Sequence, residues 1–146
     1  MNTHEADFYS WTQEQVALLK QGRVMEVDVG CLIEELENMG ASERRELTNR
    51  LAVLLAHLLK WQYQPERRGK SWKATVKEQR QKVTRALRQN PGLKPTTGES
   101  LKDAYSDAIQ IAVRETDLDE ETFSTECPWT LEQVLAEEFW PEHTKT

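Results

Sequence analysis

A run of leucines in the middle of the chain constrains the fold more than any other feature of the sequence. Between residues 42 and 64, apolar side chains recur at steps of three and four, the spacing that gathers side chains on one face of a helix. Ser42 can cap the start of this helix, and Pro65 forbids its continuation. The apolar face consists of Leu47, Leu51, Leu54, Leu55, Leu58 and Trp61.

Three more segments have helical spacing. Upstream, Asp28 can cap a short helix that Gly40 ends, because glycine favours the left-handed conformation that follows many helices. A third helix follows Ser71 and stops at the Asn-Pro-Gly of residues 90–92, and a fourth covers about residues 99–115. The first of these segments has its apolar side chains at Leu32, Ile33, Leu36 and Met39.

Similar six-residue segments stand near the two ends of the chain. Residues 11–16 read WTQEQV, and residues 129–134 read WTLEQV. In both, threonine is followed three residues later by glutamine, as in the capping box of a helix start. We therefore expect helices capped by Thr12 and Thr130. Together, the patterns predict an all-α helical bundle of about four main helices plus short terminal helices, with no sheet.

Length and composition limit the organisation of the chain. The 146 residues suffice for one domain, so we expect a single all-helical domain over residues 1–146, with short flexible termini at about 1–6 and 142–146. No apolar stretch approaches the roughly 20 residues that a bilayer requires, so we expect no membrane association. The first ten residues contain no Lys or Arg and no apolar core of a signal peptide, which favours a cytoplasmic location.

Several stretches together resemble a bacterial family, the domain of unknown function 29 (DUF29) family. The resemblance spans nearly the whole chain and implies an all-helical fold. It implies no activity, cofactor or catalytic residue. The matching stretches are DFYSWT at 7–12, EELE at 34–37 with Gly40, SERREL at 42–47, LLAHLLKWQYQPERR at 54–68, Ser71-Trp72, and CPWTLEQ at 127–133.

The spacing of ionisable residues does not predict an enzyme. His57 has Leu54 three positions before it and Trp61 four positions after it, so neither common metal-binding helical pair is present. We therefore expect no metal and no cofactor. Glu34 and Glu37 fall on one helix face, and with His57 they form one hypothesis, a carboxylate–histidine catalytic or cation site. We favour a solvated helix face for these acids.

Charge is strongly segregated along the chain. Residues 1–40 hold 2 basic and 8 acidic side chains, residues 41–90 hold 13 and 4, and residues 91–146 hold 4 and 13, within a net charge of −6. Cations interleaved with aromatics in the middle block are typical of single-stranded nucleic-acid binding. The competing interpretation is that the acidic flanks fold against this block and neutralise it. The candidate nucleic-acid contacts are Arg67, Arg68, Lys70, Trp72, Lys73, Lys77 and Arg80.

These observations favour a non-catalytic protein-interaction or accessory module of a bacterial cytoplasmic protein. Its partner would be another protein or a second copy of the chain. The alternative is nucleic-acid binding through the basic segment 67–88, and the third hypothesis is the site at Glu34, Glu37 and His57.

Overall fold

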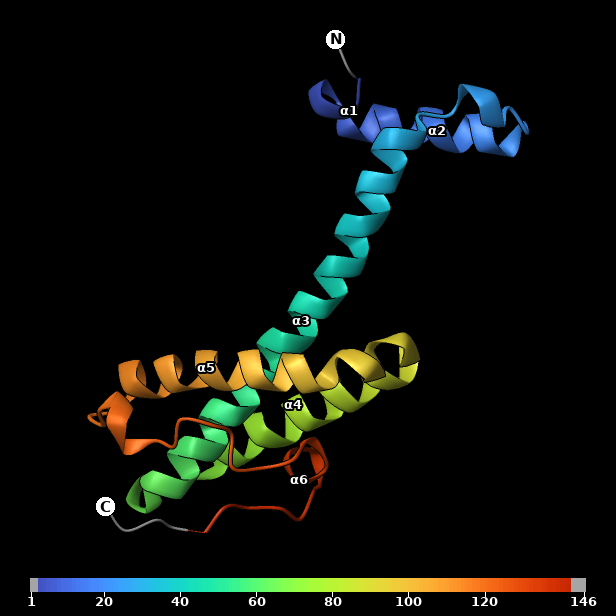
Figure 1. Cartoon of the computed structure of the whole chain (residues 1–146). Coiled ribbons are helices and arrows are strands. Elements are labelled where there is room, and N and C mark those ends of the chain that lie inside the picture. The colour runs from blue at the N-terminus through green and yellow to red at the C-terminus, as the bar shows by residue number, and fades with distance from the viewer. Residues whose placement is uncertain (1–2, 143–146) are drawn as a thin grey trace. The chain divides into compact units, whose positions relative to one another are not determined.

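The chain folds into helices joined by short turns, and the computed structural model describes residues 3–142 (Figure 1). Within these residues there is no strand, which confirms the all-α prediction. The predicted flexibility of residues 1–2 and 143–146 lies outside the described residues. The helices are α1 (Thr3–Ala6), α2 (Phe8–Lys20), α3 (Val29–Tyr63), α4 (Lys70–Gln89), α5 (Thr97–Glu115) and α6 (Leu131–Leu135). Short 3-10 turns lie at η1 (Val24–Glu26), η2 (Pro65–Arg67), η3 (Pro91–Thr96) and η4 (Glu120–Thr122).

The chain divides into two compact units, of which the first ends at Ser42 and the second begins at Glu43. In the first unit, Asp7 caps α2 by accepting a hydrogen bond from the backbone N–H of Ser10 at 3.0 Å. The prediction that Thr12 caps a helix is therefore wrong. Because the helix is capped at Asp7, five residues earlier, the hydroxyl of Thr12 instead donates to the carbonyl of Tyr9 at 2.7 Å.

Asp28 links α2 to the start of α3 within the first unit. Its backbone N–H donates to Gln15 Oε1 at 2.8 Å, and its carboxylate accepts from the indole of the buried Trp11 at 3.4 Å. The same carboxylate accepts from the N–H of Cys31 at 3.2 Å, as a cap of α3 does. The predicted cap at Asp28 is thus confirmed.

Helix α3 continues through Gly40, so the prediction of two separate helices is wrong. Glycine permits a left-handed backbone but does not impose it. The one glycine with positive φ among the described residues is Gly22, at 72°, in the turn after α2. Gly40 keeps the helical conformation at a cost of about 1 kcal/mol relative to alanine.

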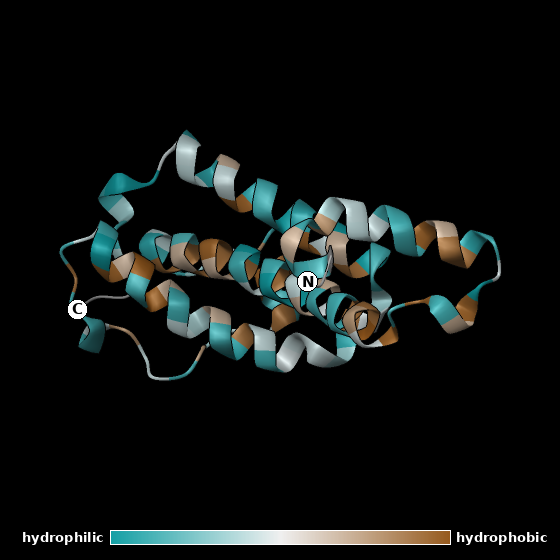
Figure 2. Ribbon diagram, turned by 90° about the horizontal axis from the view of Figure 1, so that it is seen from above, coloured by the Kyte–Doolittle hydropathy of each residue, from teal (hydrophilic) through white to brown (hydrophobic). Residues whose placement is uncertain are grey.

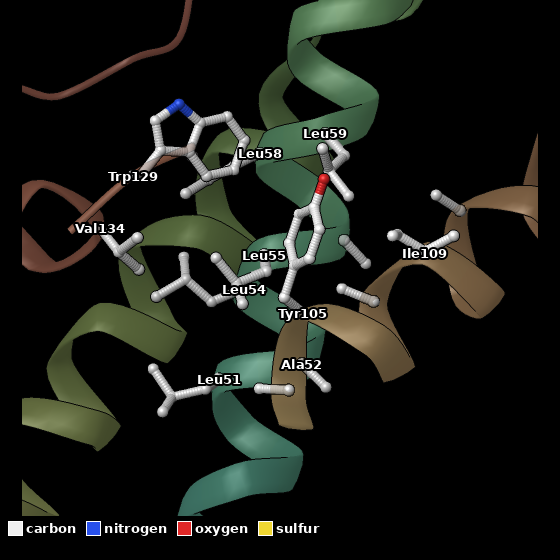
Figure 3. Close-up of a cluster of buried hydrophobic side chains, with 14 of the residues drawn as sticks. Leu51, Ala52, Leu54, Leu55, Leu58, Leu59, Tyr105, Ile109, Trp129 and Val134 are labelled. Carbon is white, nitrogen blue, oxygen red and sulfur yellow. The ribbon is translucent and has the colours of Figure 1, made fainter. Parts of the chain in front are cut away.

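The second unit has the core that the leucine pattern predicts. Leu47, Leu51, Leu54, Leu55 and Leu58 are all at most 1% exposed. Helix α4 contributes Val76 and Val83 to this core, and α5 contributes alanines, Tyr105 and Ile109. The C-terminal segment covers the core with Trp129 and Val134 (Figure 3). Hydrophobic residues recur among hydrophilic ones along the long helices, as in amphipathic helices (Figure 2).

The C-terminal cap is as predicted. Thr130 accepts from the N–H of Gln133 at 3.2 Å, and the side chain of Gln133 accepts from the N–H of Thr130 at 2.9 Å, which completes a capping box. Tyr105 of α5 donates its hydroxyl to the carbonyl of Ser124 at 2.8 Å. These bonds fix the irregular segment after α5 onto the core of the second unit.

Candidate interaction surfaces

Arg80 of α4 fastens the C-terminal segment to the second unit. Its side chain is buried, and its Nε, Nη1 and Nη2 donate to the carbonyls of Val134, Glu137 and Phe139 at 2.8, 3.1 and 2.5 Å. Burial lowers the pKa of Arg80, against the opposing effect of the nearby Glu137 and Glu138. Since all three nitrogens donate to backbone carbonyls, Arg80 attaches the C-terminal segment to α4, and its role as a nucleic-acid contact stays a prediction.

Two other residues that were predicted to contact nucleic acid, Arg68 and Trp72, form cation–π pairs within the protein. Arg68 donates from Nε to the carbonyl of Trp61 at 2.7 Å, and its guanidinium lies 4.8 Å from the centre of that ring. Lys60 Nζ lies 5.3 Å from the Trp72 ring centre. Trp61 and Trp140 have ring centres 4.3 Å apart. Arg68 and Trp72 are half-buried, so these cations and rings stabilise the turn between α3 and α4.

Four other basic residues of α4, beyond the turn that precedes it, face solvent. Lys73, Lys77, Arg85 and Arg88 are exposed, and within the described part of the chain none of the four forms an ion pair. Lys82, by contrast, pairs with Glu78 at 2.6 Å. Lys73, Lys77, Arg85 and Arg88 therefore keep their positive charges without a paired carboxylate among residues 3–142.

These four cations line one wall of a groove in the second unit, which we call the basic groove. Its volume is about 740 Å³. The other residues along α4 are Arg80, Gln81 and Thr84, and the opposite wall is Leu135, Glu137 and Trp140. Lys73, Lys77 and Arg80 were in the predicted site, whereas Arg67, Arg68, Lys70 and Trp72 do not line the groove. Arg85 and Arg88 also line the groove, and both lie within the predicted basic segment 67–88.

The predicted polar cluster is not assembled within either unit. Glu34 and Glu37 are exposed in the first unit, whereas His57 is half-buried in the second. His57 Nδ1 donates to the carbonyl of Val53 at 2.9 Å, and burial lowers the pKa of the imidazole, so it is neutral at pH 7. Among residues 3–142, no group of three or more His, Cys, Asp or Glu side chains could hold a metal ion.

Cys127 lies in the wall of a second cavity, of about 900 Å³, between α5 and the segment after it. Its thiol lies 3.4 Å from the carbonyl of Trp129, to which it donates. Burial raises the pKa of this thiol, which keeps it protonated. A protonated, half-buried thiol is a poor nucleophile, so this cavity has no activated cysteine.

The first unit exposes an unusual amount of apolar surface. Every exposed large hydrophobic side chain that the structure describes lies between Phe8 and Met39. Four of them stand on the first turns of α3, and we call these four the apolar stripe: Val29, Ile33, Leu36 and Met39, which are 50–64% exposed. The helical spacing in the sequence identified three of the four, Ile33, Leu36 and Met39. Spacing alone does not indicate whether other parts of the protein cover these side chains.

No helix in the described part of the chain combines the length and apolarity needed to cross a membrane.

Comparison with known proteins identifies the family to which the chain belongs. The family model for the domain of unknown function DUF29 matches residues 3–140, which include α1 to α6. Neither a search of curated proteins nor a search of solved structures found a match. Since the family model covers nearly the whole chain, the chain belongs to the DUF29 family.

Proposed function

We propose that this chain is a non-catalytic protein-interaction module of a bacterial cytoplasmic protein, and that its partner binds the apolar stripe. The observation that carries the proposal is the exposure of Val29, Ile33, Leu36 and Met39 together on one helix. Single exposed hydrophobic residues are common on protein surfaces, but an exposed row of them marks an interaction site.

The stripe has the geometry of a helix that docks against another element. Val29, Ile33 and Leu36 stand at positions i, i+4 and i+7, which lie on one helix face. Complete burial of such side chains contributes about 1.5–3 kcal/mol each. Because about half of each side chain is still exposed, a partner that covers the stripe gains on the order of 1 kcal/mol per residue.

Charge determines the kind of partner. Residues 1–42 hold 2 basic and 8 acidic side chains, and Glu34 and Glu37 lie within the stretch of α3 that carries the stripe. A second copy bound stripe to stripe would bring two acidic surfaces together, which opposes association. The surface instead fits a different protein whose apolar contact is flanked by Lys and Arg.

A crosslinking experiment followed by reconstitution tests the proposal. A photoreactive amino acid at Ile33 should capture a partner in cells, and the same group at Asn38 should not. The captured protein, once purified, should bind the wild-type chain. The double variant Ile33→Ser/Leu36→Ser should bind it at least 10-fold more weakly, since truncation of central apolar contacts costs about 1–2 kcal/mol each.

The matched control is Asn38→Ser/Ala41→Ser, which changes two exposed residues of the same helix outside the stripe without altering charge. It should bind as the wild type does. Equal binding by Ile33→Ser/Leu36→Ser would refute the role of the stripe. A dimer seen by light scattering that Ile33→Ser/Leu36→Ser abolishes would replace the basic partner protein with a second copy of the chain.

A further inference from the structure

We propose that the basic groove of the second unit binds a single strand of nucleic acid. This site is separate from the apolar stripe, which belongs to the first unit. The proposal rests on the groove's unpaired cations, on their arrangement along α4 and on the aromatic side chain of the opposite wall.

The groove has an excess of positive charge that the protein does not neutralise. Arg80 is committed to three carbonyls of the C-terminal segment, which leaves Lys73, Lys77, Arg85 and Arg88 as exposed cations. Glu137 is the one carboxylate among the lining residues. The net charge of the chain is −6, but at physiological ionic strength the Debye length is about 8 Å, so nearby charges dominate at the groove.

The cations are arranged for a polymer and not for a single small anion. From Lys73 to Arg88, fifteen helical positions correspond to roughly 22 Å along the axis of α4. Between these ends, Lys77 and Arg85 continue the row. A site for one phosphate brings its donors to a point, whereas a row of separated cations matches successive phosphates of a backbone.

An aromatic side chain favours a nucleic acid over other polyanions. Trp140 lines the groove opposite α4 and is half-buried, with the Arg80 guanidinium 5.3 Å from its ring centre. Its other neighbour is Trp61, at 4.3 Å between ring centres, so the indole is held in place. An aromatic side chain beside a cationic row is the combination with which proteins bind single strands.

A single strand fits this site better than a duplex. Readout of a duplex requires an element that projects into the major groove, whereas here the phosphate-binding side chains line a concave surface. Unpaired bases of a single strand are also free to reach Trp140.

The test is fluorescence anisotropy with the full chain and labelled single-stranded DNA and RNA of about 20 nucleotides in mixed sequence. Four phosphate contacts predict a slope of about −2.8 for log K against log salt, so affinity should fall roughly 50-fold from about 50 to about 200 mM salt. The variant Lys73→Gln/Lys77→Gln/Arg85→Gln removes three contacts and should reduce the slope to about −0.7.

The control is Lys94→Gln/Lys102→Gln/Arg114→Gln, which removes three exposed cations from the same unit outside the basic groove. It changes the net charge equally and should retain the wild-type slope. Circular dichroism checks that both triple variants remain folded. Equal loss in the two variants, or no binding at low salt, would overturn the proposal. Competition by polyglutamate as effective as by the single strand would assign the groove to an acidic peptide, and tighter binding of duplex would also contradict the inference.

Discussion

Replacing Arg80 by methionine should loosen the C-terminal segment from the second unit. Methionine keeps most of the side-chain volume but removes all three hydrogen bonds to the carbonyls of Val134, Glu137 and Phe139. The bond to Val134 is buried, so its carbonyl would lose its partner without access to water, at a cost of about 1–3 kcal/mol.

The bonds to Glu137 and Phe139 are only partly buried, so water can replace the lost donor there. Each then costs about 0.5–1.5 kcal/mol. Relief from burying the guanidinium charge offsets part of this loss. We therefore expect Arg80→Met to lower the free energy of unfolding by about 3 kcal/mol, equivalent to a decrease in melting temperature of roughly 6–12 °C.

Urea unfolding followed by tryptophan fluorescence measures this effect in the second unit, since four of the five tryptophans lie there. Arg85→Met is the matched control. It removes an exposed arginine from the same helix and should change stability by less than about 0.5 kcal/mol. If Arg80→Met and Arg85→Met unfold at the same urea concentration, the hydrogen bonds of Arg80 do not stabilise the C-terminal segment.

Three further predictions concern stability. Gly40→Ala should stabilise the protein by about 0.5–1 kcal/mol, because Gly40 is helical and an added Cβ meets no atom within 4 Å; thermal unfolding that shows a loss would contradict a continuous α3. Burial lowers the pKa of His57 below its ordinary value of 6.5, so the unfolded chain binds the proton first as pH falls. Stability should then decrease below about pH 6.5, by at most about 1.4 kcal/mol per pH unit, and urea titrations of His57→Gln should lack this contribution. Thr130→Ala should cost about 1 kcal/mol by circular dichroism, whereas an unchanged midpoint would show that the capping box of α6 is dispensable.

Local chemistry explains which parts of the fold were predictable. The apolar period of residues 42–64 identified the core helix, because a face of leucine at three- and four-residue steps has one stable solution, burial against other helices. The cap at Thr130 was also predictable, since both halves of the capping box lie within four residues. The identical spacing at Thr12 led to a wrong prediction, because the helix already begins after Asp7.

The candidate surfaces were less accessible to sequence reasoning. The basic block of residues 41–90 was evident from composition, but its basic side chains have different surroundings in the fold. Arg80 and Lys77 are three residues apart and both line the groove, yet Arg80 is buried beneath the C-terminal segment and Lys77 is exposed. Contacts made across more than 50 residues of sequence separate these roles, and no local pattern encodes them.

The sequence by itself determined the helical class, the leucine core, the cap at Thr130 and the membership of residues 3–140 in the DUF29 family. Only the tertiary structure decided that α3 passes through Gly40, that the apolar stripe is uncovered and that, among residues 3–142, the four exposed cations of the basic groove have no carboxylate partner. The physical reason is that helix formation depends on neighbours within one or two turns, whereas exposure depends on which distant segments pack against a face. For this protein, exposure is what distinguishes a structural side chain from one that is available to a partner.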